Sequence, residues 1–326
     1  MKRDRENEAP ETRNLSRREI LGLIGATAAA SLVGGAGEQS ASGQQASPTQ
    51  NMRSRIIKFD AKPEPIAIDT AKTVVSVVDM QNDFGTKGGL FDHAGFDISI
   101  IQKAIGPTAT VLAAARHAGL KIIYLKMGFR SDLSDLGSEG SPNRMRHLLA
   151  GVGKTVHAPN GTESRILIRD TWNTDIVGEL KPQTEDVVIY KHRFSGFYQT
   201  DLDAVLKQLT VKYLIITGCT TSVCVESTIR DAMFRDYVCV LLADCTGEVV
   251  GSGLPRSNHE ASLFLIQQRF GWVSTSDEFI RALGLPQLKI SGNELHSPNQ
   301  QAAPAAAGLK PDKSCRFKRS MQHHLV

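Results

Sequence analysis

The chain has 326 residues, of which 41% are hydrophobic, and a formal net charge of +4 at pH 7. Polar, low-complexity ends reduce the part that can fold, so we expect one domain of roughly 200–230 residues. The modest charge gives no reason to expect a nucleic-acid partner. The five cysteines are odd in number and unevenly spaced, which argues against a disulfide framework.

The first segment has the order of an export signal. Arg17 and Arg18 precede a weakly apolar, Ala- and Gly-rich run over residues 21–34. This order predicts a twin-arginine signal within residues 1–37, with the Tat translocase as a transient partner and a periplasmic or extracellular destination. The run is shorter than the ~20 residues that span a bilayer, so we expect no stable membrane anchor. A chance Arg-Arg in a disordered tail, or a cytoplasmic protein with an unused upstream start, are the alternatives.

Composition divides the rest of the chain into three segments. Residues 38–54 are rich in Ser, Gln and Ala, which is typical of a linker. Residues 291–326 lack apolar periodicity and end in a basic cluster, which predicts a disordered tail. The folded domain is therefore expected over residues 55–290.

Within residues 55–290, short β-branched runs alternate with segments whose apolar residues recur at helical spacing. The strands are expected at residues 73–80, 121–127, 186–190, 213–218, 238–243 and 272–273. The helices are expected at residues 98–118, 201–209, 222–235, 258–270 and 277–283. This alternation predicts a doubly wound, Rossmann-like α/β domain, in which a parallel sheet of about six strands lies between two layers of helices.

Three reactive side chains follow strands of this sheet. Asp79 ends the first strand, Lys191 follows the third, and Cys224 lies on the turn that leaves the fourth. Ligands of such sheets bind at the carboxyl ends of the strands, so these residues can meet. If Ser222 caps the next helix, the helix N-terminus and a nearby ammonium would lower the pKa of the Cys224 thiol. An acid, a cation and a thiol together would suit nucleophilic catalysis.

Each of these residues also has an ordinary structural explanation. An acid that ends a buried strand often only caps a loop, and a cysteine is more often a small buried hydrophobe. Lys191 could be a solvated strand end, with His192 or Arg193 as the important cation. The pattern alone leaves these alternatives open.

Three segments resemble the signature segments of the isochorismatase-like cysteine hydrolases. They are VVDMQNDF at 77–84, KHRFSGFYQTDLD at 191–203 and GCTTSVCVESTIRDA at 218–232. The similarity runs from about residue 72 to residue 283 and is greatest to the branch of the ureidoacrylate amidohydrolases and biuret hydrolases. It implies a cysteine-dependent amidohydrolase that cleaves a C–N bond of a small, ureidoacrylate-like ureide or amide. No cofactor is expected, because no glycine-rich nucleotide-binding motif follows the first strand. The resemblance also implies a homodimer or homotetramer.

The resemblance assigns roles to particular residues. It implies that Asp79, Lys191 and Cys224 form a catalytic triad in which the thiolate attacks the amide carbonyl, an amine leaves, and water hydrolyses the thioester. It further implies a non-proline cis peptide between Cys219 and Thr220. The oxyanion hole would then consist of the backbone N–H groups of Thr220 and Cys224.

Several side chains near these segments are candidates for the substrate pocket. The candidates closest to the catalytic segments are Gln81, Asn82, Phe84, Phe197 and Tyr198. Phe84 and Phe197 are equally well explained as core residues. The long polar segment over residues 128–173 could close over the site. It supplies four residues that could bind a substrate carboxylate, Arg130, Arg144, Arg146 and Trp172.

Neighbouring functions fit the sequence less well. Metal-dependent nicotinamidases of this superfamily carry an Asp-x-His motif, whereas His147 and His157 are isolated here, so no metal is expected. A redox pair of Cys219 and Cys224 would have four intervening residues instead of two. The open alternatives are a hydrolase of biuret, N-carbamoyl amino acids, maleamate or nicotinamide, and a non-catalytic exported protein of the same fold.

Overall fold

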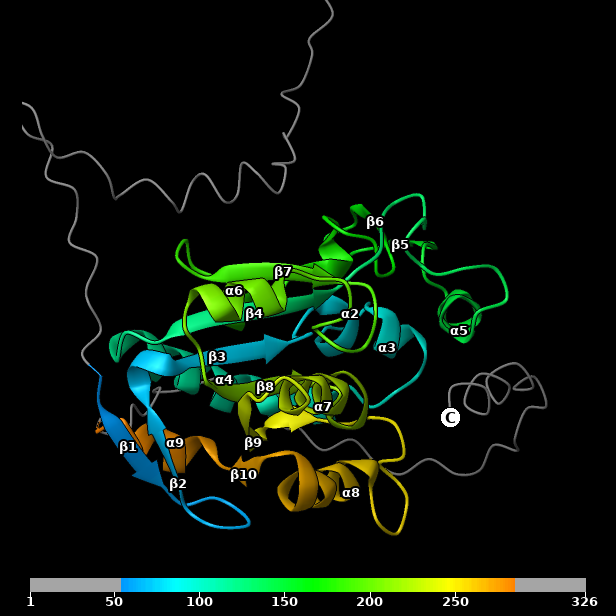
Figure 1. The fold of residues 1–326 in the computed structure, drawn as a ribbon. Coiled ribbons are helices and arrows are strands. Elements are labelled where there is room, and N and C mark those ends of the chain that lie inside the picture. Colours follow the sequence, from blue (N-terminus) through cyan, green and yellow to red (C-terminus); the bar gives the residue numbers. More distant parts are fainter. Residues whose placement is uncertain (1–53, 285–326) are drawn as a thin grey trace, which may run out of the picture. The chain divides into compact units, whose positions relative to one another are not determined.

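The computed structural model describes residues 54–284, which contain a six-stranded parallel sheet in the order β10-β9-β8-β3-β4-β7 (Figure 1). Its strands are β3 (Thr73–Val78), β4 (Lys121–Met127), β7 (Val187–Lys191), β8 (Tyr213–Cys219), β9 (Val238–Gly247) and β10 (Trp272–Ser274). All neighbouring pairs are parallel. The predicted doubly wound α/β fold is confirmed.

Helices cover both faces of the sheet. They are α4 (Ser99–His117), α6 (Leu202–Gln208), α7 (Glu226–Met233), α8 (Asn258–Leu265) and α9 (Ser276–Ala282). Successive side chains of a strand point to opposite faces, so Val75 and Val77 of β3 join one apolar cluster, whereas Val74 and Val78 join another. The first cluster includes side chains of α4 and α9, and the second includes side chains of α6 and α7. This double burial explains why every residue of β3 is buried.

Two short strands were not expected from the sequence. They are β1 (Ile56–Phe59) and β2 (Ile66–Asp69), which pair in antiparallel fashion. Phe59 packs edge-on against Phe279 of α9, with ring centroids 5.8 Å apart. Each strand has only four residues, too few for a clear period-2 pattern. The short 3-10 helix η1 (Thr70–Lys72) joins this hairpin to β3.

The polar segment after β4 is partly ordered into regular elements. It contains α5 (Pro142–Ala150), β5 (Thr155–His157), β6 (Glu163–Arg165), η2 (Trp172–Thr174) and η3 (Gly178–Leu180). β5 and β6 form an antiparallel hairpin. Figure 1 shows α5 and this hairpin beyond the carboxyl end of β3, on the same side as α2 (Asn82–Gly85) and α3 (Leu90–His93). The insertion therefore lies where a parallel sheet binds its ligands.

The helix after β8 differs from its expected form. It begins as a π-helical turn, η4 (Thr221–Val225), before α7, and α8 likewise continues into the π-helical turn η5 (Ile266–Phe270). The expected cap by Ser222 is wrong, because its N–H and hydroxyl both donate to Glu248 Oε2, at 2.7 and 2.6 Å. π-Helical turns occur often at functional sites.

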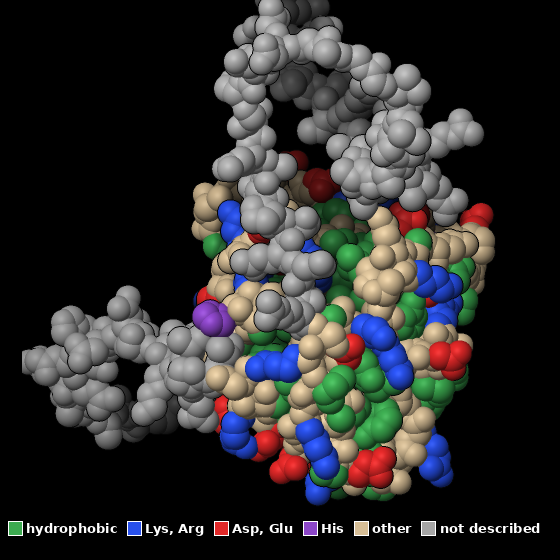
Figure 2. Space-filling model, turned by 60° about the vertical axis from the view of Figure 1, so that its left-hand side comes forward, with side chains coloured by type: hydrophobic (Ala, Val, Ile, Leu, Met, Phe, Trp, Pro, Cys, Tyr) green, Lys and Arg blue, Asp and Glu red, His purple; other side chains and the backbone are tan. Residues whose placement is uncertain are grey.

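No helix within residues 54–284 combines the length and the apolar character needed to cross a bilayer. On the face shown in Figure 2, basic and acidic side chains are interspersed with apolar ones. The predicted signal over residues 1–37 and tail over residues 291–326 lie outside the described residues, as does all but the last residue of the linker 38–54.

Candidate active site

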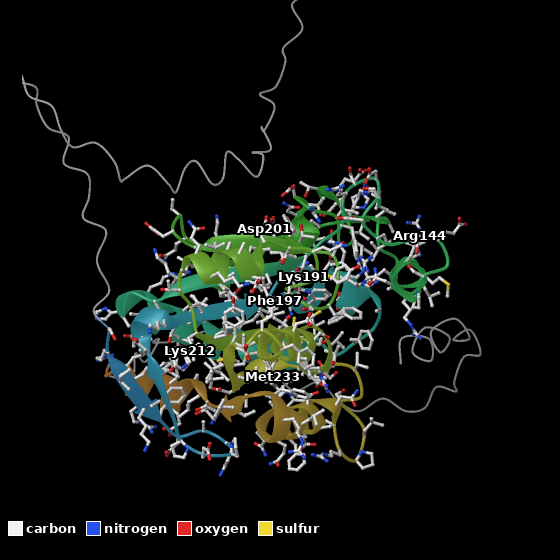
Figure 3. The ribbon with its side chains drawn as sticks, viewed as in Figure 1. Arg144, Lys191, Phe197, Asp201, Lys212 and Met233 are labelled. Carbon is white, nitrogen blue, oxygen red and sulfur yellow. The ribbon has the colours of Figure 1, made fainter. Side chains whose placement is uncertain are left out.

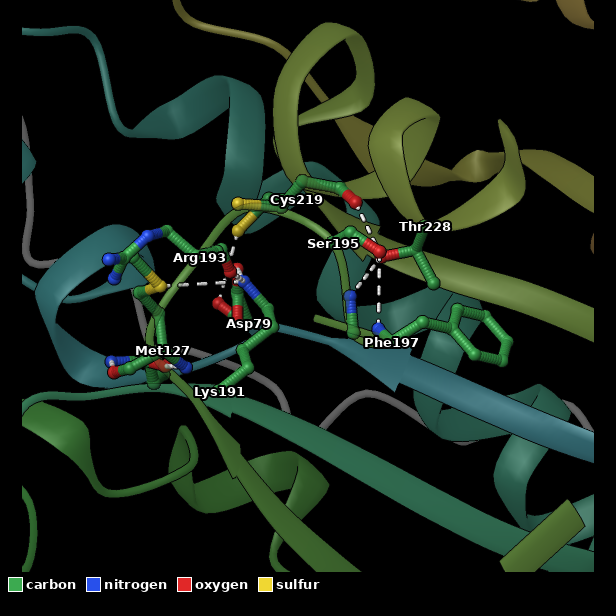
Figure 4. Close-up of polar contacts among 11 residues, drawn as sticks. Asp79, Met127, Lys191, Arg193, Ser195, Phe197, Cys219 and Thr228 are labelled. Atoms are coloured by element: carbon green, nitrogen blue, oxygen red, sulfur yellow. Dashed lines mark hydrogen bonds and ion pairs between the residues drawn. The ribbon is translucent and has the colours of Figure 1, made fainter. Parts of the chain in front are cut away.

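The structure brings the three reactive side chains together at the carboxyl edge of the sheet. Asp79 directly follows β3, Lys191 is the last residue of β7, and Cys224 lies in η4 after β8. Lys191 Nζ is 2.7 Å from Asp79 Oδ2, and both side chains are fully buried. Figure 4 shows this pair close to Cys219. Because Lys191 is fully buried, it is not a solvated strand end.

The backbone at Asp79 has a left-handed conformation, with φ 53°. Its N–H donates to Leu125 O at 2.8 Å, and its carbonyl accepts from Cys219 Sγ at 3.1 Å. A residue other than glycine is uncommon in this region, although aspartate tolerates it better than most. Hydrogen bonds to strands β4 and β8 thus fix the backbone of Asp79 and orient its carboxylate.

Lys191 keeps its charge despite its burial. Its ammonium contacts the Asp79 carboxylate, Met127 Sδ at 3.5 Å and Arg193 O at 3.3 Å. Burial alone lowers the pKa of the ammonium, but the charges and hydrogen bonds of Asp79 and Cys224 together outweigh burial and raise the pKa above its ordinary value. The lysine is therefore a fixed positive charge in the site.

The thiol of Cys224 does not have the expected lowered pKa. Burial raises its pKa, the charge of Asp79 raises it further, and the charge of Lys191 only partly opposes them. Burial also raises the pKa of Asp79, and the charge of Lys191 is the main cause that opposes the rise. The raised pKa of Cys224 favours the thiol form of its side chain. Asp79 lines the same cavity as Cys224, so its carboxylate is the candidate acceptor of the thiol proton.

The turn before Cys224 has the predicted cis peptide between Cys219 and Thr220. Gly218 precedes it with φ 117°, and a Cβ at this position would lie 1.9 Å from Val78 O. Only glycine fits here, because β3 passes too close for any side chain. The backbone of this turn is therefore determined by its packing against the strand that carries Asp79.

A group of polar side chains fixes the other side of the turn. Thr221 Oγ1 lies 2.9 Å from Thr246 Oγ1 and 2.9 Å from His259 Nδ1. Glu248, buried just after β9, accepts the two hydrogen bonds from Ser222. Burial raises the pKa of Glu248, and the Ser222 donors oppose the rise. Sequence patterns gave no indication of this group.

Thr228 connects the cysteine to the lysine segment. Its Oγ1 donates to Cys224 O at 2.7 Å and accepts from Gly196 N at 3.0 Å (Figure 4). A Cβ on Gly196 would lie 2.5 Å from Leu125 Cδ1, so this position also requires a small residue. The hydroxyl group of Thr228 thus links the segment that contains Cys224 to the segment that follows Lys191.

A cavity of about 190 Å³ opens beside Asp79, Thr220 and Cys224. Most of its lining is apolar. The aromatic and long aliphatic side chains in it are Phe84, Leu90, Phe91, Met127, Leu167 and Phe194. Smaller apolar residues complete this part of the lining, Ala150, Val223 and Val250. Helix α5 adds two polar residues, Arg146 and His147.

His147 is buried in the wall of this cavity, although it looked isolated in the sequence. Its Nδ1 lies 2.7 Å from Asn143 O, and a carbonyl oxygen can only accept, so Nδ1 carries the proton. Burial lowers the pKa of the ring, and the bond to Asn143 opposes this only in part. The imidazole is neutral, which leaves Nε2 as a hydrogen-bond acceptor. In the sequence, only the spacing of four residues between Asn143 and His147 could have indicated this hydrogen bond.

Two of the pocket candidates belong to the frame of the site instead. Gln81 Nε2 donates to Met127 O, and Gln81 Oε1 accepts from Met127 N, both at 2.9 Å. Asn82 Nδ2 donates to Trp172 O at 2.8 Å, and its Oδ1 accepts from Thr86 Oγ1 at 2.9 Å. Both side chains are buried and neither lines the cavity, so these bonds stabilise the frame of the site.

Of the aromatic candidates, Phe84 lines the cavity. Phe197 and Tyr198 are not in its lining. Phe197 packs in the core and stacks on Tyr237, with ring centroids 5.9 Å apart, and Tyr198 is 45% exposed. Phe197 and Tyr198 are close to Lys191 in the sequence, but neither side chain reaches the cavity.

Among the four candidates of the insertion, Arg146 lines the cavity and is exposed to solvent. Arg144 lies on the same helix, apart from Lys191 in Figure 3, and its guanidinium points to the carbonyls of Leu133 and Gly137. Arg130 is exposed, and Trp172 supplies only its carbonyl, to Asn82. Within residues 54–284, no group of three or more His, Cys, Asp or Glu side chains is arranged to hold a metal.

A buried acid, lysine and cysteine at the carboxyl edge of a parallel sheet, next to a cavity, form the arrangement of an enzyme active site. The isochorismatase domain model matches residues 73–278, so the chain belongs to the isochorismatase family. The chain is 39% identical over 222 residues to the ureidoacrylate amidohydrolase RutB of Variovorax paradoxus, covering 68% of this chain and 85% of that protein. It is 38% identical to RutB of Caulobacter segnis, covering 73% of this chain and 97% of that protein.

A solved structure agrees with this assignment. The cysteine hydrolase from Pseudomonas syringae pv. phaseolicola is 31% identical to the chain, with a TM-score of 0.57. The similarity covers 72% of this chain and 99% of the other. The predicted resemblance is thus confirmed at the level of the family.

The burial of the ion pair predicts a large difference between two lysines. Lys191→Met leaves Asp79 buried without its counter-charge, so we expect the free energy of unfolding to fall by about 3 kcal/mol or more. Lys207 also lies 2.7 Å from a carboxylate, that of Asp203, but its side chain is 71% exposed. Lys207→Met should change the same quantity by less than about 1 kcal/mol. Urea unfolding of the two variants tests this, and equal losses would contradict it.

The raised thiol pKa predicts the pH dependence of alkylation in the absence of substrate. Because the folded protein holds Cys224 as a thiol, its reaction with iodoacetamide should accelerate continuously between about pH 6 and pH 9. Peptide mass spectrometry measures the rate at Cys224, with the buried Cys239 in the same digest as internal control. A rate that reaches a plateau near neutral pH would show a stable thiolate and refute the raised pKa.

Proposed function

We propose that Cys224 attacks the carbonyl of a small amide or ureide and forms a thioester that water then hydrolyses. The chain is a hydrolase that acts on carbon–nitrogen bonds other than peptide bonds, as the family and its amidohydrolase relatives indicate. The observation that carries the mechanism is the buried Asp79–Lys191 pair at 2.7 Å beside Cys224.

The geometry gives each residue a step. As the sulfur bonds to the carbonyl carbon, its proton passes to Asp79, whose raised pKa suits it to hold the proton briefly. Lys191 keeps the carboxylate in place and offsets its charge. The nitrogen leaves with the proton from Asp79, and a water then attacks the thioester, transferring its proton to Asp79 and restoring the thiol on Cys224.

We assign the oxyanion hole to the backbone N–H groups of Thr220 and Cys224. The packing of this turn supports the assignment, because Gly218 lies against β3 and Ser222 donates two hydrogen bonds to Glu248. Donors that are fixed before the reaction stabilise a developing oxyanion without reorganising, and one such donor is worth about 3 kcal/mol.

Ureidoacrylate is the first substrate to test, because the relatives at 38–40% identity are ureidoacrylate amidohydrolases. Its carboxylate would have Arg146 as the cation within the cavity lining. The apolar lining favours a second candidate, another small amide with fewer polar groups. Biuret, N-carbamoyl amino acids, maleamate and nicotinamide complete the panel. The expected homodimer or homotetramer stays a prediction.

Loss of the nucleophile should abolish turnover. With the best substrate of the panel, Cys224→Ala should lower kcat by at least about a thousandfold. Cys239→Ala is the matched control, because that cysteine is also buried but lies in β9 and does not line the cavity. Quenched wild-type reactions should also show the acyl mass on the Cys224 peptide. Activity that persists in Cys224→Ala would refute the mechanism, and no turnover of any amide by the wild type would favour the non-catalytic alternative.

We further propose that residues 1–37 act as a twin-arginine signal that exports the folded enzyme. The support is the order of Arg17, Arg18 and the apolar run. Cell fractionation should then find a shortened protein outside the cytoplasm, and replacing both arginines by lysine should retain the full-length chain inside. Full-length wild-type protein found only in the cytoplasm would contradict export.

A further inference from the structure

The cavity beside Cys224 offers a substrate few polar partners. Apart from Asp79, Thr220 and Cys224, which belong to the reacting centre, its polar side chains are Arg146 and His147. Arg146 is exposed, and His147 provides a single acceptor, Nε2, because Asn143 occupies Nδ1. The remaining wall is built from aromatic and aliphatic side chains.

Candidate polar groups near the site are occupied by other bonds. Both ends of the Gln81 side chain are bonded to the backbone of Met127, and both ends of the Asn82 side chain are bonded within the fold. The carboxylate of Asp83 accepts from Leu90 N, Leu167 N and Asn173 Nδ2. The polar residues of this region therefore stabilise the frame and leave an apolar surface toward the substrate.

This lining disfavours a substrate with many hydrogen-bonding groups. Each buried N–H or C=O group left without a partner weakens binding by roughly 5- to 150-fold. A compact ureide such as biuret carries several such groups beyond the reacting carbonyl. Apolar groups in the same position would gain affinity instead, by about fourfold for each methylene removed from water.

The size of the cavity limits the apolar group. Its volume is about 190 Å³. A cavity of about 150 Å³ lined by Leu, Ile and Phe holds one benzene molecule. A phenyl ring or a branched chain of similar bulk therefore fits beside the thiol.

We propose that the physiological substrate, on the proposed thiol mechanism, is an amide or ureide whose body is apolar and about the size of a phenyl ring or a branched alkyl chain. Phe84, Phe194 and Met127 enclose that body. The alternative is a substrate whose carboxylate pairs with Arg146, and the experiment separates the two.

Two matched pairs test this substrate class on the full-length wild-type enzyme. Isovaleramide carries an isopropyl group where malonamide carries its second carboxamide, and butylurea carries an ethyl group where 3-ureidopropionate carries its carboxylate. We expect kcat/KM to be at least about tenfold higher for the apolar member of each pair. From acetamide to valeramide it should rise by about fourfold per methylene.

Each outcome has a distinct meaning. A preference for 3-ureidopropionate or malonamide, or no dependence on chain length, would overturn the apolar substrate while leaving the proposed hydrolase intact. Absence of turnover for every amide and ureide would instead overturn the proposed function, and this inference with it.

A pair of variants locates the selection in the cavity. Phe194 is 42% exposed and Phe234 is 66% exposed, so both tolerate a polar residue, but only Phe194 lines the cavity. Phe194→Asn should reduce the isovaleramide-to-malonamide ratio of kcat/KM by about fivefold, since it removes apolar contact and adds a polar partner. Phe234→Asn should leave the ratio unchanged. An unchanged ratio in Phe194→Asn would contradict the assignment of that residue.

Discussion

The active site depends on one interaction, the ion pair between Asp79 and Lys191 inside the protein. Two charges without access to water are tolerated only when each satisfies the other. The pair joins the ends of β3 and β7, which are separated in the sheet by β4. The Met127 backbone at the end of β4 is in turn bonded to Gln81, so three strand ends are fixed together. The thiol of Cys224 then enters an environment whose charges are already balanced.

The sequence predicts the scaffold better than the site. Long β-branched runs and helical periodicity locate every strand of the main sheet, and double burial makes the apolar signal strongest in a central strand such as β3. The rule that parallel strands bind ligands at their carboxyl ends makes Asp79, Lys191 and Cys224 candidates, and the family resemblance adds their roles. The cis peptide at Cys219 follows from family resemblance and not from any property of the residues themselves.

Other features depend on contacts between residues far apart in the chain. Gln81 and Asn82 look like substrate ligands because they are polar and adjacent to Asp79, yet their bonds reach residues 46 and 90 positions away. His147 looks isolated because α5 is far from Asp79 and Cys224 in the sequence, although it lies against the cavity in the fold. The pKa of Cys224 is raised because several elements bury the thiol. Its place at the start of a helix, taken alone, predicts a lowered pKa. Local patterns cannot include such long-range contacts.

The protonated state of the buried thiol has a consequence for the survival of the enzyme. Peroxides and other oxidants attack the thiolate, so a cysteine held as a thiol between turnovers is protected from conversion to sulfenic acid. Cys219, Cys239 and Cys245 are buried as well, and burial raises the pKa of each. On the proposed mechanism, Cys224 becomes a reactive thiolate only while Asp79 receives its proton, during attack on a bound substrate. The folded chain itself then limits the oxidation of its nucleophile.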